Sequence, residues 1–445
     1  MTRKLVFFII LVFLLASCTG SEEDVSPSPH SSFDQTSPVP RPTIVNSVAT
    51  TPSQSSNNST ESNLSPQERQ EIFEALWSTV NEEYVDPKLN GVDWEKIRKE
   101  YDNRVNAVKN DAEFHDLMRQ MVGELRDQHS AYYSPQESRD VFRLVRGDNG
   151  GAGLGVSLMP LSNEQAAIVQ WPIPGNAAAN AGIRSGDLIL AVNGKPVCCD
   201  ANGNLYESVL LDQTGSQAVV TVKSDSQPPR NVAMTRKPIH LQDVVEGETL
   251  PGGVAYIRIN TFLKGHLVDD FDPVWQKLSS QNPKGLVIDL RTNGGGMKYE
   301  AMDILAYFLP DGEYGYYQSR EYDAPLLIHK ASRNVNGSQS VPLALLVDET
   351  TSSIAEVFAL VLQETGRARI FGNPTAGNVE ITLRYDLPHG ATAFIAVERY
   401  ISMNGKNIEG RGVTPDERIS QRWRDVISPG DDQALKAAIQ WIERK

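Results

Sequence analysis

The chain has 445 residues, enough for two or three domains, and its 42 basic and 56 acidic residues give a net charge of −14 at pH 7. Such an acidic surface repels phosphate backbones, which argues against nucleic acid as a partner. The 7 histidines are scattered, and neither a His-Glu-x-x-His motif nor a Cys-x-x-Cys pair occurs. We therefore expect no metal site and no cofactor.

The first 18 residues have the pattern of a secretory signal peptide. Arg3 and Lys4 form a short basic region, and the apolar run 5–15 is too short to span a bilayer as a helix. Small residues then precede Cys18, and this ending resembles the bacterial lipobox, whose cysteine is acylated and becomes the mature N-terminus. We expect an exported protein, lipid-anchored to the membrane of the cell envelope with its domains outside the cytoplasm. The alternative is an ordinary signal peptide with an incidental cysteine.

Residues 19–64 are rich in Ser, Thr, Pro, Asn and Gln and nearly free of aromatic residues. They cannot bury enough apolar surface to fold, so we predict a disordered tether. Helical periodicity begins after Ser65-Pro66, an N-cap followed by proline at the first helical position. Apolar residues recur at three- and four-residue spacing over 72–80 and again over 111–125. This pattern predicts a helical domain over 65–148.

Residues 149–238 contain short strand-like runs separated by glycine turns. The adjacent Cys198 and Cys199 are interpreted as free or buried thiols, because a disulfide between neighbours strains the peptide that joins them. In the remainder, 239–445, the run Val254–Ile259 alternates, while 285–290 and 341–347 are apolar runs that lead into helical segments. Such βα units predict an α/β fold with a mostly parallel sheet.

Two of these strand ends carry residues suited to chemistry. Residues 289–296, Asp-Leu-Arg-Thr-Asn-Gly-Gly-Gly, follow a buried run, and an N–H freed by such a glycine turn is what an oxyanion hole needs. A plain tight turn explains this run equally well. Residues 348–356, Asp-Glu-Thr-Thr-Ser-Ser-Ile-Ala-Glu, place hydroxyls at a strand-to-helix turn, where the next N–H can meet a developing oxyanion. On its own, a helix cap is the commoner interpretation.

The other polar segments give only weak evidence of a functional site when each is considered alone. His129 lies in a loop, where a lone histidine is usually structural, and it becomes a candidate only if a serine elsewhere needs a base. Residues 375–378 and 408–416 have the composition of turns.

Taken together and in this order, the segments from residue 65 onward resemble the C-terminal-processing (tail-specific) serine peptidases. Residues 182–194 resemble a PDZ signature, and Gly153-Leu154-Gly155-Val156 resembles the loop whose N–H groups hold a peptide carboxylate. A dinucleotide site is excluded because the third glycine and the following helix are missing. The resemblance implies a PDZ domain over 149–238 and a catalytic domain of the ClpP/crotonase-like α/β fold over 239–445.

By position, Ser353 matches the nucleophile of the family, and Gly295 and Ile354 match the donors of its oxyanion hole. Lysine-dependent members carry their general base where this chain has Asn378, which has no basic lone pair. The resemblance therefore excludes a simple Ser-Lys dyad at this position.

The tricorn-like branch of the superfamily is more similar at these positions, because its serine is activated by a histidine early in the chain and supported by a carboxylate. His129 and Glu409 match these residues. The branch has a serine just before its histidine, where this chain has Gln128, so the link from Glu409 to His129 stays open. Glu380 is a rival acidic partner.

The resemblance implies an exported serine endopeptidase that cleaves unfolded or C-terminally tagged proteins through an acyl-enzyme. Its partners would be peptides or proteins with free C-termini, bound to the PDZ domain by strand addition. The alternative is a catalytically degenerate lipoprotein that captures peptides or apolar ligands, because fold alone does not fix function. No oligomeric state is predicted.

Overall fold

The structure is a computed structural model, and it describes residues 64–127, 129–139, 153–161, 164–199, 205, 207–210, 214–224, 227–239, 241, 244–329, 336–421 and 431–445. The predicted signal peptide with Cys18, the predicted tether up to residue 63, and Gln128 lie outside the described residues. Within the described ranges, no helix has the length and apolar character needed to cross a membrane.

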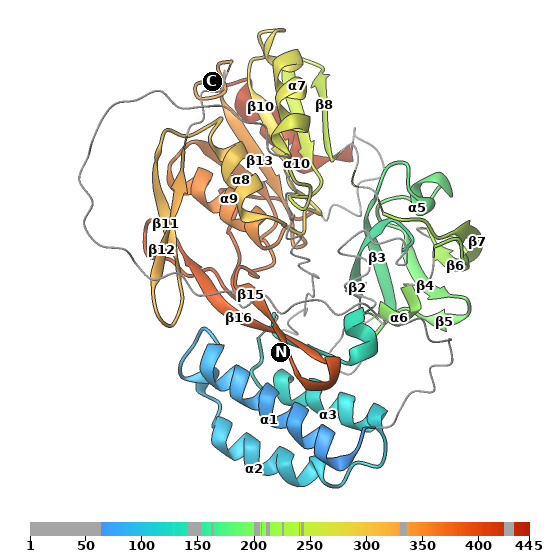
Figure 1. Ribbon diagram of the computed structural model, residues 1–445. Helices are drawn as coiled ribbons and strands as arrows, with labels where there is room; N and C mark the ends of the chain where they lie inside the picture. Colours follow the sequence, from blue (N-terminus) through green and yellow to red (C-terminus); the bar gives the residue numbers. More distant parts are fainter. Residues whose placement is uncertain are drawn as a thin grey trace, which may run out of the picture. The chain divides into compact units, whose positions relative to one another are not determined.

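The first described segment is helical, with α1 (Pro66–Glu83), η1 (Leu89–Gly91), α2 (Trp94–Val105) and α3 (Asp111–Gly123) (Figure 1). The predicted start of α1 is confirmed, since Ser65 Oγ accepts the N–H of Glu68 and the Glu68 carboxylate accepts the N–H of Ser65. The sequence analysis missed α2. Three of its twelve residues are buried, so its apolar periodicity is sparse.

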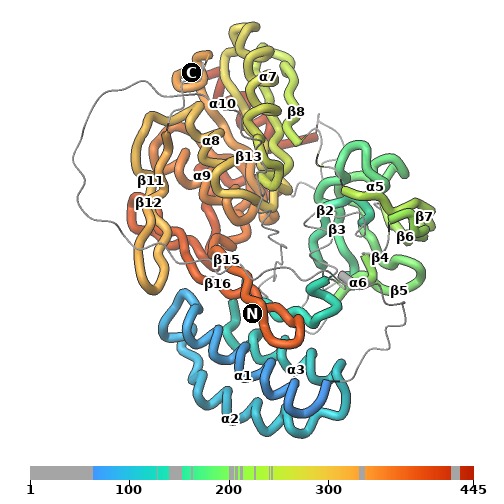
Figure 2. The backbone as a smooth tube through the Cα atoms, viewed as in Figure 1, coloured from blue at the N-terminus to red at the C-terminus, as the bar shows by residue number. Residues whose placement is uncertain are grey.

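An antiparallel sheet joins this helical segment to the C-terminal part of the chain. Its strands are β1 (Ala131–Tyr133), β11 (Gly312–Gln318), β12 (Asp323–Ile328), β15 (Ile381–Asp386) and β16 (Thr392–Ile401), in the order β1-β16-β11-β12 with β15 also on β16. The short η2 (Pro388–Gly390) connects β15 to β16. Apolar residues of α1 and α3 share one core with Ala393 and Ile395 of β16, and Figure 2 shows these elements side by side. The sequence analysis did not predict this sheet.

The predicted PDZ segment forms a sheet of its own, in the order β2-β3-β4-β6-β7 with β5 on β4. Its elements are β2 (Val156–Leu161), β3 (Ala166–Pro172), α5 (Ala177–Asn180), β4 (Leu188–Val192), β5 (Lys195–Pro196), α6 (Glu207–Leu210), β6 (Gln217–Lys223) and β7 (Arg230–Thr235). Neighbouring strands run antiparallel, and β2 lies at one edge.

One expectation in this segment is wrong. Cys198 and Cys199 are joined by a disulfide across a cis peptide bond, whereas the sequence analysis favoured free or buried thiols. That expectation rested on the strain that such a disulfide places on the peptide joining the two residues.

The predicted α/β core is confirmed, with a sheet in the order β17-β14-β13-β10-β9-β8. Its strands are β8 (Val245–Leu250), β9 (Val254–Ile259), β10 (Leu286–Asp289), β13 (Leu343–Val347), β14 (Ala368–Gly372) and β17 (Glu417–Arg418). All neighbours are parallel except β8 and β9. The helices of this part are α7 (Val268–Ser279), α8 (Lys298–Leu305), α9 (Ile354–Glu364) and α10 (Gln433–Ile442).

Both faces of the parallel sheet are covered, which explains the continuous apolar runs in the sequence. Successive residues of a strand point to opposite faces. Leu286 and Ile288 of β10 accordingly pack in the core formed with α7, α8 and α9, while Val287 packs against α10. Because β10 and β13 are parallel, with Asp289 opposite Leu346, the segments that follow them leave the sheet at the same edge. This edge holds both motifs predicted to carry chemistry.

Candidate active site

Ser353 occupies a strained turn between β13 and α9. It is the N-cap residue of α9, with φ 58° and ψ −132°, a conformation that residues other than glycine rarely adopt. Such conformations persist only where the surroundings enforce them, and they concentrate at functional sites. Here the Ser353 N–H donates to the main-chain oxygen of Asn378 (2.8 Å) and to Glu356 Oε2 (3.1 Å). The turn presents the serine side chain as a nucleophile elbow does.

The loop before Ser353 is fixed by a buried carboxylate. Asp348 Oδ1 accepts the N–H groups of Thr350 and Thr351, both at 2.9 Å, and the hydroxyl of Thr350 at 2.8 Å. The Ser352 N–H donates to the main-chain oxygen of Asn293 (3.0 Å), which ties the loops after β13 and β10 together. Burial raises the pKa of Asp348 to about 6, and the two hydrogen bonds from Thr350 counteract part of that rise.

The two predicted oxyanion donors, Ile354 and Gly295, differ in whether their N–H groups are free to bind an oxyanion. Ile354 is the first residue of α9, so its N–H has no acceptor within the helix. The Gly295 backbone lies directly against Ser353, and a Cβ built on Gly295 would come 2.6 Å from Ser353 Cβ and 3.2 Å from Ser353 Oγ. The Gly295 N–H, however, donates to Asn293 Oδ1 at 2.8 Å. Its role as a donor stays a prediction that requires this bond to open.

Glu356 holds the loop 375–378 against α9. Its carboxylate is fully buried and accepts the Thr375 hydroxyl (2.5 Å) and the N–H groups of Gly377 (2.7 Å) and Asn378 (2.8 Å). Burial raises the pKa of Glu356 to about 7, although these hydrogen bonds act to lower it. The sequence analysis gave Glu356 no role of its own, although the Ser-x-x-Glu spacing before an apolar helix is a capping-box signal that could have assigned it.

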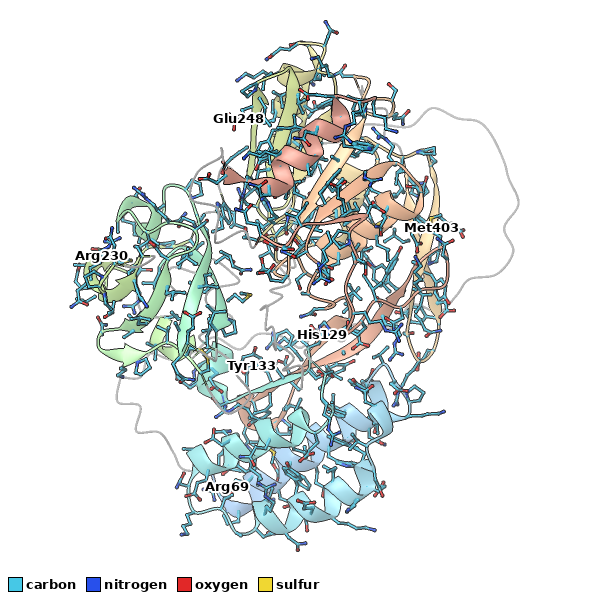
Figure 3. The ribbon with its side chains drawn as sticks, turned by 180° about the vertical axis from the view of Figure 1, so that it is seen from behind. Arg69, His129, Tyr133, Arg230, Glu248 and Met403 are labelled. Atoms are coloured by element: carbon cyan, nitrogen blue, oxygen red, sulfur yellow. A yellow bond between two sulfur atoms is a disulfide. The ribbon has the colours of Figure 1, made fainter. Side chains whose placement is uncertain are left out.

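His129 lies just before β1, and the pairing of β1 with β16 brings it to the C-terminal part of the chain (Figure 3). Its side chain is 7 % exposed, and its Nε2 is 3.2 Å from Glu409 Oε1. Asp127, which the sequence analysis did not single out, shapes this loop by accepting the N–H groups of His129 (3.0 Å) and Ser130 (2.7 Å). Two of the predicted residues, 280 positions apart, are thus in direct contact.

The acidic surroundings change the protonation of His129. Burial would lower the pKa of His129, but the hydrogen bond to Glu409 and the charges of Glu409, Glu380 and Asp127 outweigh it and raise the pKa above its ordinary value. The rival carboxylate, Glu380, also faces this group. Its side chain is 6 % exposed, its charge partner Arg399 lies 3.6 Å away, and burial raises the pKa of Glu380 to about 7.

One short loop joins the serine and the histidine. The main-chain oxygen of Asn378 accepts the Ser353 N–H, while the next two N–H groups, of Val379 and Glu380, donate to Glu409 Oε2 at 2.8 and 3.2 Å. Among the described contacts, this loop is the link, and no direct hydrogen bond joins Ser353 Oγ to the imidazole. Catalytic hydrogen bonds are often long in the absence of substrate.

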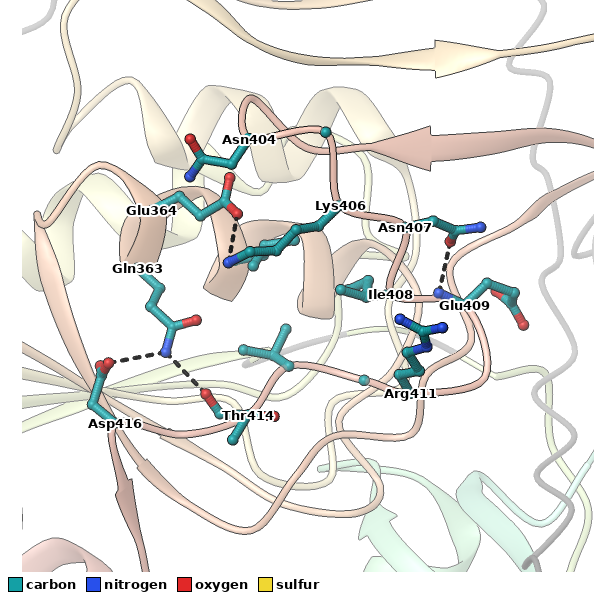
Figure 4. A pocket seen from close by; sticks show the side chains of 14 residues that line it. Gln363, Glu364, Asn404, Lys406, Asn407, Ile408, Glu409, Arg411, Thr414 and Asp416 are labelled. Carbon is teal, nitrogen blue, oxygen red and sulfur yellow. Dashed lines mark hydrogen bonds and ion pairs between the residues drawn. The ribbon is translucent and has the colours of Figure 1, made fainter.

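A cavity of about 840 Å³ has Glu409 among its lining residues (Figure 4). It is lined by the C-terminal half of α9 and by residues between 404 and 416. Gln363 donates to the Thr414 main-chain oxygen (2.9 Å) and to Asp416 (3.1 Å), and Lys406 pairs with Glu364 (3.1 Å).

The predicted peptide-binding loop, Gly153 to Val156, leads into the edge strand β2. Leu154 is buried in the core of this domain, and the main-chain oxygens of Leu154 and Gly155 accept the N–H groups of Ala178 and Ile173. A Cβ on Gly155, whose φ is +71°, would come 2.3 Å from Asn176 Cβ. The loop is therefore fixed from inside, next to a strand edge of the kind to which peptides add.

Comparison with known proteins matches three parts of the chain to protein families. The model of peptidase family S41 matches residues 253–419, that of the tricorn protease C1 domain matches 65–123, and that of the PDZ domain matches 168–223. The carboxyl-terminal-processing protease of Synechocystis sp. is 26 % identical over 391 residues, covering 84 % of this chain and 87 % of that protein. Its namesake from Picosynechococcus sp. is 29 % identical over 359 residues, covering 80 % and 84 %. The chain therefore contains a peptidase family S41 domain, and over most of its length it is similar to carboxyl-terminal-processing proteases.

The solved structure of the photosystem II D1 C-terminal processing protease is similar to this peptidase, with a TM-score of 0.62 and 25 % identity over 84 % of this chain and 96 % of that one. The predicted family, the α/β fold and the enzyme class are confirmed. A peptidase with a PDZ domain acts on peptide or protein substrates, so a degenerate ligand-binding lipoprotein is not favoured. The tricorn match covers the helical segment and includes neither His129 nor Glu409.

Proposed function

We propose that this peptidase is an endopeptidase that cleaves unfolded or C-terminally tagged proteins outside the cytoplasm, through an acyl-enzyme on Ser353. The observation that carries the proposal is the strained turn that presents Ser353 at the N-terminus of α9, against the backbone of Gly295. A hydroxyl placed there can attack a carbonyl whose developing negative charge meets N–H groups.

In this mechanism His129 is the general base. The ring nitrogen that is not bonded to Glu409 takes the Ser353 proton, and Glu409 orients the ring and stabilises the imidazolium that forms. Asn378 has no basic lone pair, so it contributes through its main-chain oxygen, which holds the Ser353 N–H. Because the pKa of His129 is raised, its base form becomes available at a higher pH than that of an ordinary histidine.

Ile354 and Gly295 are the proposed oxyanion donors, and each such donor typically contributes on the order of a hundredfold in rate. Gly295 can act only after its N–H leaves Asn293 Oδ1, so we place this rearrangement at substrate binding. His129 then returns its proton to the leaving amine, and water hydrolyses the acyl-enzyme with the same base.

We further propose that the PDZ domain binds free C-termini. The Gly153–Val156 loop would hold the terminal carboxylate, and the extended peptide would add to the edge of β2. The isolated segment 148–240 should bind peptides with a free carboxylate and lose affinity when they are amidated. Equal binding of both forms would contradict carboxylate capture.

The location of the peptidase is likewise a proposal, which the N-terminal sequence supports. The basic region, the apolar run and the small residues before Cys18 fit an exported lipoprotein anchored in the cell envelope. Labelled fatty acid should enter the expressed protein, and Cys18→Ala should release it from membranes. A mature N-terminus at another residue would exclude the lipid anchor.

The catalytic proposal is tested with a serine-directed fluorophosphonate probe and mass-spectrometric mapping of its site. Labelling at Ser353, absent in Ser353→Ala, is expected together with hydrolysis of a denatured protein. No labelling and no hydrolysis of denatured, peptide or C-terminally tagged substrates would overturn it.

A further inference from the structure

We propose that His129, Glu380 and Glu409 form a binding site for a divalent transition-metal ion of the Zn²⁺ type, and that a bound ion switches the peptidase off. The proposed binding follows from the positions, burial and charge of the three side chains and does not depend on the proposed function. The inhibitory half rests on the proposed function, in which His129 is the general base.

The three side chains converge on one point. One ligand atom from each, the imidazole nitrogen and two carboxylate oxygens, lies within 4.8 Å of the other two, and His129 Nε2 is 3.2 Å from Glu409 Oε1. Ligand atoms around a tetrahedral zinc ion are roughly 3.3 Å apart, given bond lengths of about 2.0–2.1 Å. Small side-chain rotations would therefore close the site. One imidazole and two carboxylates form a three-ligand zinc site that leaves a fourth position for water.

Burial and charge make this group unlike an acidic patch on the surface. The exposed fractions of the side chains are 7 % for His129, 6 % for Glu380 and 19 % for Glu409. Two nearly buried carboxylates repel each other, and the only ion pair of Glu380 in the described part of the chain is the 3.6 Å contact with Arg399. A dication bound between the two carboxylates would compensate them both.

The surroundings already orient the proposed ligands. Glu409 Oε2 accepts the N–H groups of Val379 and Glu380, which leaves Oε1 directed at the imidazole. Asp127 fixes the backbone at His129 by accepting its N–H. Hydrogen bonds of this kind hold metal-ligating side chains in place in known sites.

His389 has the same kinds of neighbours as His129 but a different arrangement of them. His389 also meets two glutamates, but Glu68 lies 3.5 Å from its Nδ1 and Glu71 lies 2.7 Å from its Nε2. Two carboxylates on opposite ring nitrogens cannot share one ion with that ring. Its side chain is also 27 % exposed. His389 is therefore a matched control with the same residue types.

The sequence analysis expected no metal site because it found no local ligand motif. The proposed ligands lie at positions 129, 380 and 409 and meet only through the pairing of β1 with β16 and the turn 408–412. An ion on the nitrogen that faces Glu409 would remove the carboxylate that supports the base. Its positive charge would also weaken the affinity of the ring for the serine proton.

Binding is tested by titrating Zn²⁺ into the full chain by calorimetry, with Co²⁺ as a spectroscopic substitute. The Ser353→Ala variant serves as the main sample, because it cannot turn over substrate or digest itself. One ion per chain and a Co²⁺ spectrum of four- or five-coordinate type are expected. Glu380→Gln and Glu409→Gln, both isosteric, should weaken binding at least about 100-fold, since losing even a supporting residue costs about 10–100-fold.

His389→Ala should bind as the parent does. Unchanged affinity in both glutamine variants, or loss of affinity in His389→Ala, would overturn the proposed site. Inhibition is measured separately on the wild type, whose hydrolysis Zn²⁺ should suppress at concentrations near its dissociation constant and a chelator should restore. Binding without inhibition in an active enzyme would overturn the inhibitory half. A wild type that never hydrolyses substrate but binds Zn²⁺ would overturn the proposed function and leave the site standing.

Discussion

The turn that carries Ser353 and the loops that carry His129 and Glu409 are held in place by different forces. The serine turn depends on main-chain geometry, since parallel β10 and β13 deliver two loops to one edge. There Asp348 accepts N–H groups from both loops, those of Thr292 and Thr350. Glu356 accepts the N–H of Ser353. The histidine depends on charge, because carboxylates surround one imidazole. We infer that catalysis is more sensitive to changes of backbone than of charge on the serine side, and more sensitive to changes of charge on the histidine side.

The largest effect is expected where the two sides must act together. Ser353→Ala and His129→Ala should each abolish peptide hydrolysis, with a loss in kcat approaching that of a dismantled triad, about 10⁶-fold. The double variant should be no worse than either single one, because the two residues act as one unit. Single-turnover assays on a denatured protein measure this. His389→Ala is the control, and full activity of His129→Ala would move the search for the base to Glu380.

Glu409→Gln tests the charge on the histidine side with little change in shape. The variant keeps an oxygen near the ring but loses the negative charge that raises the pKa of His129. The loss in kcat should be roughly 10–100-fold smaller than that of Ser353→Ala, since an orienting carboxylate is one step from the reacting bond. If Glu380→Gln costs more than Glu409→Gln, the roles of the two carboxylates are reversed.

Gly295→Ala tests the geometry of the serine side with no change in charge. The new Cβ would lie 2.6 Å from Ser353 Cβ, and φ at this position is +95°. We expect a loss in kcat on the order of 10²–10³-fold, the cost of a displaced oxyanion donor. Gly253→Ala is the matched control, because its φ is +79° but no atom lies within 4 Å of the added Cβ. Equal losses in both variants would attribute the effect to backbone strain alone.

The contrast between the serine turn and the histidine loops also explains which parts of the site could be predicted from the sequence. Ser353 and Gly295 lie in segments that follow strands directly, so period and turn chemistry were enough to mark these segments. The resemblance then selected the two residues within them. The β1–β16 pairing was missed because a three-residue strand carries almost no periodic signal, and its partner is about 260 residues away. The contact of His129 with Glu409 was inferred only from resemblance. The roles of Asp127 and Asp348 depend on loop geometry that no pattern specifies.

The smallest predicted effect concerns the stability of the folded protein and its dependence on Asp289, the last residue of β10. Burial alone would raise the pKa of Asp289, but Arg291, Arg258 and a hydrogen bond from Tyr256 lower it to about 2. Because this folded value lies below the unfolded value of about 3.9, the carboxylate contributes stability at neutral pH that is lost as the pH falls from about 4 to 2. Asp289→Asn should therefore lower the free energy of unfolding by about 2 kcal/mol at pH 7. Urea titrations should show this difference shrinking below pH 4, while the exposed Asp323→Asn changes little at either pH. A difference that keeps its full size at pH 2.5 would mean that Asp289 stabilises the edge by packing rather than by its charge.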